Sequence, residues 1–182
     1  MNKKLLFALL LCAAPALKAA EIEFVESVPE ETVYGSSLTA RPAQTWIEMI
    51  NGAAKTLYFE EFYIADRAGE ALEPVLAAIK AAAARGVNVR FIVEKAMMRE
   101  TSKALPALTS EKNIEARVIE FKKIAGGVQH SKFFIVDGRE VYVGSQNFDW
   151  RALSQIHEIG ARVKSERAAR DFGSIFEADW AM

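Results

Sequence analysis

The sequence has very little of the two residue types that form disulfides and bind transition metals. Its 182 residues include 1 cysteine and 2 histidines. The cysteine, Cys12, lies near the N-terminus, and Leu11 stands before it where a lipid-attachment site needs a small residue. An intrachain disulfide is therefore excluded, and the fold must depend on an apolar core.

Long apolar runs are scarce as well. The run over residues 5–11 is far shorter than the roughly 20 residues that a membrane-spanning helix needs. Lys3 and Lys4 precede this run and small residues follow it, which is the order of a secretory signal peptide. We therefore predict a signal peptide over residues 1–20, no transmembrane anchor, and a periplasmic or secreted mature protein.

An excess of positive charge is also missing. The chain has 23 basic and 24 acidic side chains, and cleavage after residue 20 would remove three lysines and leave 20 basic side chains. A general electrostatic attraction to nucleic acid is therefore excluded, and binding of a polyanion would need a local patch.

The order of apolar patterns predicts a single α/β domain over residues 21–182. Ser37 or Thr39 is expected to cap the first helix, and Gly86 to end the second. Asp137-Gly138 predicts a hairpin turn. Because strands and helices alternate before a late hairpin, we expect a mixed β-sheet flanked by helices on both faces, an α-β-α sandwich. Strands are predicted over 22–28, 55–64, 88–94, 114–121, 131–136, 140–144 and 157–163, and helices over 42–53, 70–85, 99–108, 150–154 and 166–180.

The residues suited to chemistry gather around this hairpin. His130 and Lys132 are two apart, so on a strand they project from one face. The hairpin would bring Ser145 and Asn147 to the same space from the neighbouring strand. An imidazole, an ammonium, a hydroxyl and an amide together suit a phosphoryl group. No carboxylate cluster surrounds His130, so neither a metal site nor any other cofactor is predicted.

The same stretch resembles the signature of the phospholipase D superfamily. The motif H-x-K-x4-D runs from His130 to Asp137, and G-S-x-N follows from Gly144 to Asn147. The stretches "AARGVNVRFIV" and "NFDWRALSQIHEIG" are similar to segments that flank this motif in the family, so the resemblance covers nearly the whole mature chain.

The resemblance implies a two-step phosphoryl transfer through a phosphohistidine. His130 would attack phosphorus, while Lys132 and Asn147 stabilise the charged oxygens and Ser145 adds a hydrogen bond to substrate. Asp137 belongs to the motif, and its place at the hairpin turn predicts that it braces the loop. Glu158 would orient a catalytic histidine.

The family reaction uses two motifs, because a second histidine protonates the leaving group, and this chain has one. Two copies would complete the site as a homodimer, or the chain is the first half of a longer enzyme. The segment "VESVPEETVYGSSLTARPAQTWIEMI" resembles the two-motif members, whereas the size of the chain favours the dimer. His157 and Glu158 are consecutive on a strand and face opposite ways, so His157 is expected in the core or on the surface.

Three functions follow from these observations. The favoured one is a phosphodiesterase acting on nucleic acid, the second is a phospholipase D acting on phospholipid head groups, and the third is a catalytically incomplete half-domain that binds. Five further positions have two interpretations each. Either Glu60 or Glu61 would face the cleft, and Lys122, Lys123 and Arg151 would gather phosphates or remain solvated.

Overall fold

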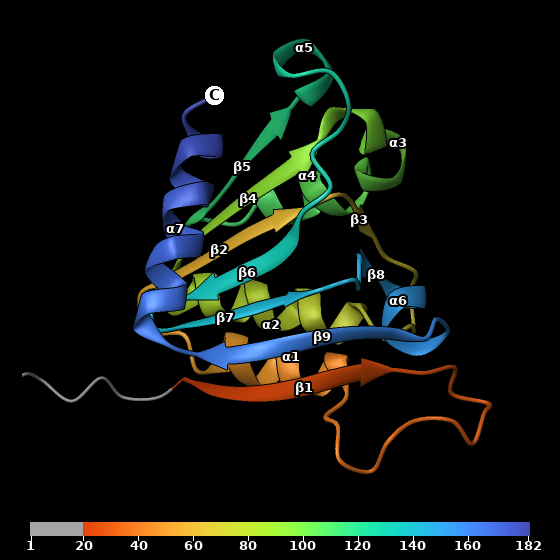
Figure 1. The fold of residues 1–182 in the computed structure, drawn as a ribbon. Helices are drawn as coiled ribbons and strands as arrows, with labels where there is room; N and C mark the ends of the chain where they lie inside the picture. The colour runs from red at the N-terminus through yellow and green to blue at the C-terminus, as the bar shows by residue number, and fades with distance from the viewer. Residues whose placement is uncertain (1–19) are drawn as a thin grey trace, which may run out of the picture.

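The computed structural model describes residues 20–182, and its centre is a seven-stranded sheet in the order β1-β9-β7-β6-β2-β4-β5 (Figure 1). β2, β4 and β5 run parallel to one another, and the other neighbours are antiparallel. The predicted signal peptide lies almost entirely outside the described residues. The strands are β1 Glu21–Ser27, β2 Thr56–Glu61, β4 Asn88–Glu94, β5 Ile114–Ile119, β6 Lys132–Val136, β7 Glu140–Gly144 and β9 Glu158–Lys164.

Helices cover both faces of this sheet, which confirms the predicted mixed α/β sandwich (Figure 1). α1 (Pro42–Asn51) and α2 (Glu73–Ala84) pack on one face over the larger apolar cluster. α7 (Glu166–Trp180) lies on the other face over a smaller cluster, where Phe172 contacts Phe133 of β6 and Phe176 stacks on Tyr58 of β2. Short elements complete the chain: β3 Ile64–Ala65, η1 Lys95–Met97, α3 Met98–Thr101, α4 Ala104–Thr109, α5 Phe121–Ile124, β8 Phe148–Asp149 and α6 Trp150–Ser154.

The start of α1 differs from the prediction. Arg41 is the cap residue, and no side chain caps the helix. Pro42 begins the helix because its fixed φ suits the first turn and its missing N–H needs no partner there. The hydroxyl of Thr39 donates instead to Glu26 in β1, 2.8 Å away. The end of α2 agrees with the prediction, since Gly86 follows it with a φ of 96°.

The predicted hairpin between β6 and β7 is confirmed. Asp137 and Gly138 have φ values of 52° and 62°, and positive φ at both central residues defines the turn that matches strand twist. The hairpin sets the register in which Phe134 pairs with Tyr142. It thereby places the start of β6 beside the end of β7, where the motif residues lie.

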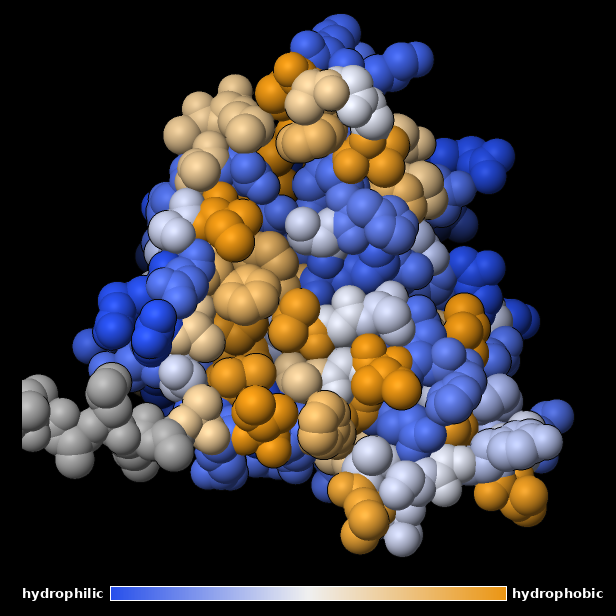
Figure 2. Space-filling model, in the orientation of Figure 1, coloured by the Kyte–Doolittle hydropathy of each residue, from blue (hydrophilic) through white to orange (hydrophobic). Residues whose placement is uncertain are grey.

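Within residues 20–182, no helix covers part of the sheet face that carries α7. α7 packs on β6 and β7, whereas Ile22, Phe24 and Ile159 on β1 and β9 are 56%, 62% and 60% exposed. Figure 2 shows apolar side chains gathered over this part of the face. We call Ile22, Phe24 and Ile159 the open apolar face.

Candidate active site

The motif residues meet at one edge of the sheet, where β2 and β7 end and β6 and β9 begin. The backbone of Ser145 joins that of Ile159, since the Ser145 N–H donates to the Ile159 carbonyl at 3.0 Å. The Ile159 N–H in turn donates to the Ser145 hydroxyl at 3.3 Å. The two segments that carry Ser145 and Glu158 are therefore fixed against each other.

His130 and Lys132 are in direct contact. The Lys132 Nζ lies 3.0 Å from Nδ1 and 3.3 Å from Nε2 of His130, and it donates to the His130 carbonyl at 2.8 Å. His130 is exposed, whereas Lys132 is 8% exposed. The predicted strand start is corrected by one residue, because β6 begins at Lys132 and His130 precedes it. The extended chain still brings the two side chains together.

This contact favours a neutral imidazole. Burial and the nearby Lys132 ammonium both lower the pKa of His130. Burial also lowers the pKa of Lys132, while Glu61 and Glu158 oppose that shift. A neutral imidazole has a free lone pair, so the arrangement suits a nucleophile held beside a fixed cation.

Phe62 is a site residue that the sequence reasoning missed. Its ring centre lies 4.4 Å from that of His130 in an edge contact, and 5.4 Å from the Lys132 Nζ. The next residue, Tyr63, donates its hydroxyl to Asp149 at 2.9 Å. The signal was available, because the pair Phe62-Tyr63 directly follows the strand β2 that lies beside the motif strand.

Glu60 and Glu61 are both buried, at 0% and 2% exposed. Glu60 accepts from the Gln129 side chain at 3.0 Å, and the Gln129 N–H donates to Glu94 at 2.9 Å. These bonds fix the residue that precedes His130. Burial raises the pKa of Glu60 to about 7. Of the two glutamates, Glu61 is the one that pairs across the sheet with Lys132, whose pKa it raises.

Glu158 lies within electrostatic reach of Lys132, and Asn147 lies in the segment between β7 and β8. Asn147 is partly buried, and among the described residues its Oδ1 has no hydrogen-bond partner. Burial raises the pKa of Glu158, and the Lys132 charge opposes the shift. Across residues 20–182, no hydrogen bond joins Glu158 to His130; its polar neighbour is Ser145. The orienting role of Glu158 stays a prediction.

Gly144 has a steric reason to be glycine. A Cβ there would lie 2.4 Å from the Gln146 Oε1 and 2.8 Å from the Cα of Gly160. Gln146 is 1% exposed and accepts from the Tyr142 hydroxyl at 2.9 Å. The glycine makes room for this inward side chain, and the chain then turns so that Ser145 is exposed.

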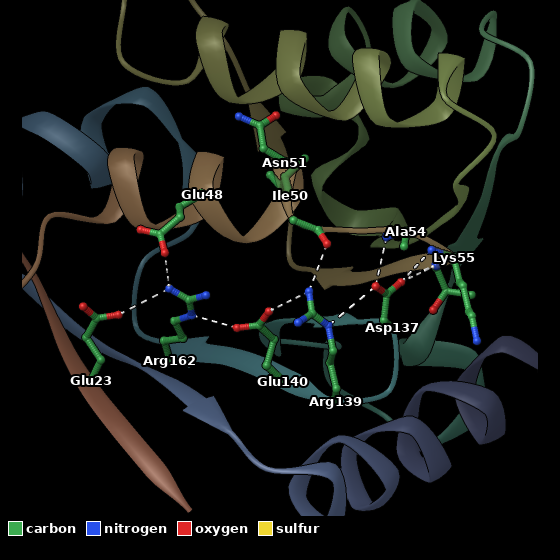
Figure 3. Close-up of polar contacts among 12 residues, drawn as sticks. Glu23, Glu48, Ile50, Asn51, Ala54, Lys55, Asp137, Arg139, Glu140 and Arg162 are labelled. Atoms are coloured by element: carbon green, nitrogen blue, oxygen red, sulfur yellow. Dashed lines mark hydrogen bonds and ion pairs between the residues drawn. The ribbon is translucent and has the colours of Figure 1, made fainter.

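Asp137 lies at the opposite end of β6 from Lys132 (Figure 3). Its carboxylate accepts from the N–H groups of Ala54, Lys55 and Thr56 at 2.9, 2.7 and 2.9 Å. Burial raises its pKa, but the three backbone bonds lower it further, so the net shift is downward. These bonds tie the hairpin turn to the residues at the start of β2, at the far end of β6 from Lys132, and the bracing role of Asp137 stays a prediction.

An ion-pair network with buried Glu140 and Arg162 at its centre continues along this part of the sheet (Figure 3). Arg162 of β9 lies 2.7 Å from Glu140 of β7 and 2.9 Å from Glu48 of α1. Glu140 also lies 3.5 Å from Arg139, beside Asp137. The network ties α1 to the two strands and belongs to the framework, because Glu140 and Arg162 lie in the half of the sheet away from Lys132.

The other cationic and imidazole candidates lie outside this group. His157 is exposed, and its Nε2 lies 2.9 Å from Glu26, which confirms a surface position. Lys122 and Lys123 are exposed in α5. Arg151 is held by Asp149 at 2.5 Å, so that its charge is largely matched by a buried carboxylate.

The described residues contain no group of three or more His, Cys, Asp or Glu that could hold a metal ion. Within the same part of the chain, no helix has the length and apolar content to cross a bilayer.

Comparisons with known proteins agree with this geometry. The family model described as "Cardiolipin synthase, PLD-like domain" matches residues 46–180. The chain therefore belongs to the phospholipase D-like family, and the resemblance inferred from the motif is confirmed. Human "5'-3' exonuclease PLD3" is 33% identical over 92% of this chain and 36% of its own length. Mouse "5'-3' exonuclease PLD4" is 30% identical over 89% and 34%.

Two solved structures share the fold. The phospholipase D family member Nuc from Salmonella typhimurium superposes with a TM-score of 0.70 at 19% identity, covering 90% of this chain and 95% of that one. NucT from Helicobacter pylori gives 0.66 at 18%, covering 76% and 86%. The chain thus spans about a third of the curated relatives and most of the length of Nuc.

Proposed function

We propose that this protein hydrolyses phosphodiester bonds through a covalent phosphohistidine. The observation that carries the proposal is the 3.0 Å contact between Lys132 Nζ and His130 Nδ1, with the imidazole exposed to substrate. The ammonium keeps the ring neutral, so its free nitrogen can attack. The same ammonium and the Asn147 amide would balance the charge that develops on the phosphoryl oxygens.

The reaction balances in two steps. His130 forms an N–P bond, the bond from phosphorus to the leaving oxygen breaks, and an acid protonates that oxygen. Water then attacks phosphorus, the N–P bond breaks, and the acid's conjugate base takes the proton from water. Because both steps need only these groups, we expect hydrolysis to continue in EDTA. Loss of activity in EDTA that a divalent ion restores would contradict this mechanism.

The proposal includes a homodimer, because the site described in residues 20–182 holds one imidazole. The other histidine, His157, is bound to Glu26 on the surface. A second copy would supply a second His130, one neutral for attack and one protonated for donation. The open apolar face supports this pairing, since its residue Ile159 directly follows Glu158 at the site.

Nucleic acid is the substrate that we propose. Phe62 presents an aromatic ring beside the nucleophile, where it would contact the group attached to the scissile phosphate. Aromatic rings stack with bases in a sequence-tolerant way. The names of the two curated relatives, both 5'-3' exonucleases, support the same substrate. Export by the predicted N-terminal signal would place this reaction in the periplasm or outside the cell.

Mixing experiments test the shared site. His130→Ala subunits, refolded with wild-type chains and purified as mixed dimers by two affinity tags, are expected to hydrolyse an oligonucleotide at a few per cent of the wild-type rate or less. Mixed dimers that keep half the wild-type rate would contradict the shared site. Hydrolysis of phosphatidylcholine but not of oligonucleotides by wild type would contradict the nucleic-acid substrate.

A further inference from the structure

Glu61 is a carboxylate enclosed in the protein directly behind Lys132. It is the last residue of β2, it is 2% exposed, and it pairs across the sheet with Lys132 of β6. Leu57 and Phe59 alternate with it and belong to the cluster beneath α1 and α2. Lys132 alternates with Phe134 of the same cluster, so both charged side chains point to one face of the sheet.

The position is unfavourable for a carboxylate. One of its oxygens, Oε2, is buried without a hydrogen-bond partner among the described residues. Burial raises the pKa of Glu61 well above its ordinary value, while the charge of Lys132 opposes the shift and that of Glu60 adds to it. An unpaired buried polar oxygen destabilises a fold, and an apolar residue of similar size would avoid that cost. A group that costs stability beside the cation of a site is a candidate for a role in that site.

The surroundings of Lys132 indicate what this role is. Burial lowers the pKa of Lys132, and Glu61 followed by Glu158 raises it. The third titratable group facing the ammonium is His130, which it contacts directly. Glu158 is partly exposed and lies at the open edge, whereas Glu61 is enclosed. Solvent therefore reaches part of Glu158, although its Oε2 is buried without a hydrogen-bond partner among the described residues, whereas solvent hardly reaches Glu61.

We propose that Glu61 is a positioning residue for the phosphodiester reaction: paired across the sheet with Lys132 and enclosed among apolar side chains, it sets the charge of the ammonium that contacts His130. This inference rests on the proposed function, since it assigns Glu61 a part in that same site. It needs no direct contact between Glu61 and substrate. Without the carboxylate, the buried lysine would lose its proton at a lower pH, and the imidazole would lose its fixed cation.

The test measures Lys132 directly. Protein with 13C at the lysine side chains is titrated by NMR, and the Lys132 signal is assigned by its absence in Lys132→Arg. Glu61→Gln is expected to lower the midpoint of the Lys132 titration by about one pH unit, the lower end of the effect of a nearby opposite charge. The alkaline limb of kcat/KM for an oligonucleotide is expected to move by the same amount. Glu61→Asp restores the charge and is expected to return both midpoints toward wild type.

Glu60→Gln is the matched control, because Glu60 is the preceding buried residue and points to the other face of the sheet. Its Lys132 midpoint is expected to stay within about 0.3 unit of wild type, since the opposite-charge effect needs a separation of about 4–6 Å. An unchanged Lys132 midpoint in folded Glu61→Gln would overturn the inference, and so would equal shifts in both variants. If Glu61→Gln does not fold, failure of folded Glu61→Asp to retain the wild-type midpoint overturns it. A wild type that hydrolyses no phosphodiester contradicts the proposed function, while the NMR result still reports on Glu61 and Lys132.

Discussion

Glu60 and Glu61 are consecutive residues of one strand, and their side chains enter opposite layers of the sandwich. Glu60 bonds Gln129 and feels the charge of Asp179 on α7, whereas Glu61 faces Lys132. Two neighbouring carboxylates with similar burial therefore affect different properties. Glu60 makes the stability of the fold depend on pH, whereas Glu61 affects the pKa of Lys132 in the site.

Glu60→Gln is expected to make the protein less sensitive to pH. The pKa of Glu60 is raised to about 7 in the folded protein, chiefly by burial, from 4.5. The native state therefore holds a proton that the unfolded chain releases. This contribution to the free energy of unfolding is full below pH 4.5 and is lost as pH rises through 7.

Urea unfolding at pH 5 and pH 8 measures this effect. Relative to Glu60→Gln, wild type is expected to lose up to about 3 kcal/mol between these two pH values. Glu115→Gln, at an exposed position of β5, is expected to follow wild type. If the free energies of unfolding of wild type and Glu60→Gln changed equally between pH 5 and pH 8, the raised pKa of Glu60 would be contradicted.

Asp137→Asn is expected to destabilise the protein at neutral pH by about 2 kcal/mol, because it removes the charge and one acceptor from three backbone bonds. The folded pKa of Asp137 lies below its usual 3.8, so its contribution is present above that value and is lost as pH falls through the folded pKa. The free energies of unfolding of the two proteins should therefore converge near pH 2. Arg139→Gln keeps the three backbone bonds and is the control. A loss that is the same at pH 7 and pH 2 would show that the charge is irrelevant.

The hairpin and the motif were the most predictable parts of the molecule. Asp137-Gly138 specifies its own turn, and the turn brings Lys132 near Ser145 without further information. The contribution of Glu61 was not predictable in the same way, since its burial depends on the parallel pairing of β2 with β4, in which Glu61 pairs with the distant Val93. The predicted side-chain cap of α1 was wrong for a related reason. The Thr39 hydroxyl donates a hydrogen bond to Glu26 of β1, and local sequence does not identify Glu26 as its partner.

Phe62→Leu is expected to weaken recognition of bases. Leucine keeps an apolar contact with His130 but removes the ring that would stack with a base. For a single-stranded oligonucleotide, kcat/KM is expected to fall on the order of tenfold. For the same oligonucleotide with an abasic site beside the scissile bond, the rates of variant and wild type should differ less than twofold.

Tyr34→Leu is the control for Phe62→Leu, because Tyr34 is 74% exposed in the loop between β1 and α1. Tyr34→Leu should leave kcat/KM unchanged for both the normal and the abasic oligonucleotide. Equal losses on the normal and abasic substrates for Phe62→Leu would indicate that Phe62 only packs against the nucleophile.

His130→Ala and His157→Ala are expected to separate catalysis from surface structure. The first removes the atom that forms the bond to phosphorus, so turnover should vanish. The second breaks the 2.9 Å contact with Glu26, which joins the residue before β9 to β1. Because that contact is exposed, its loss should change kcat less than threefold, in line with the roughly 0–1 kcal/mol of a surface ion pair.

A rapid quench into alkaline denaturant, which preserves the acid-labile N–P bond, followed by intact-mass measurement adds a readout beyond rate. Wild type and His157→Ala are both expected to carry the added mass of the phosphoryl group with its retained substituent, and His130→Ala is expected to carry none. If His157→Ala instead accumulated less covalent intermediate and lost kcat as severely as His130→Ala, His157 would be the acid that protonates the leaving oxygen. Each chain would then contain both histidines of the reaction, and the requirement for a second copy would disappear.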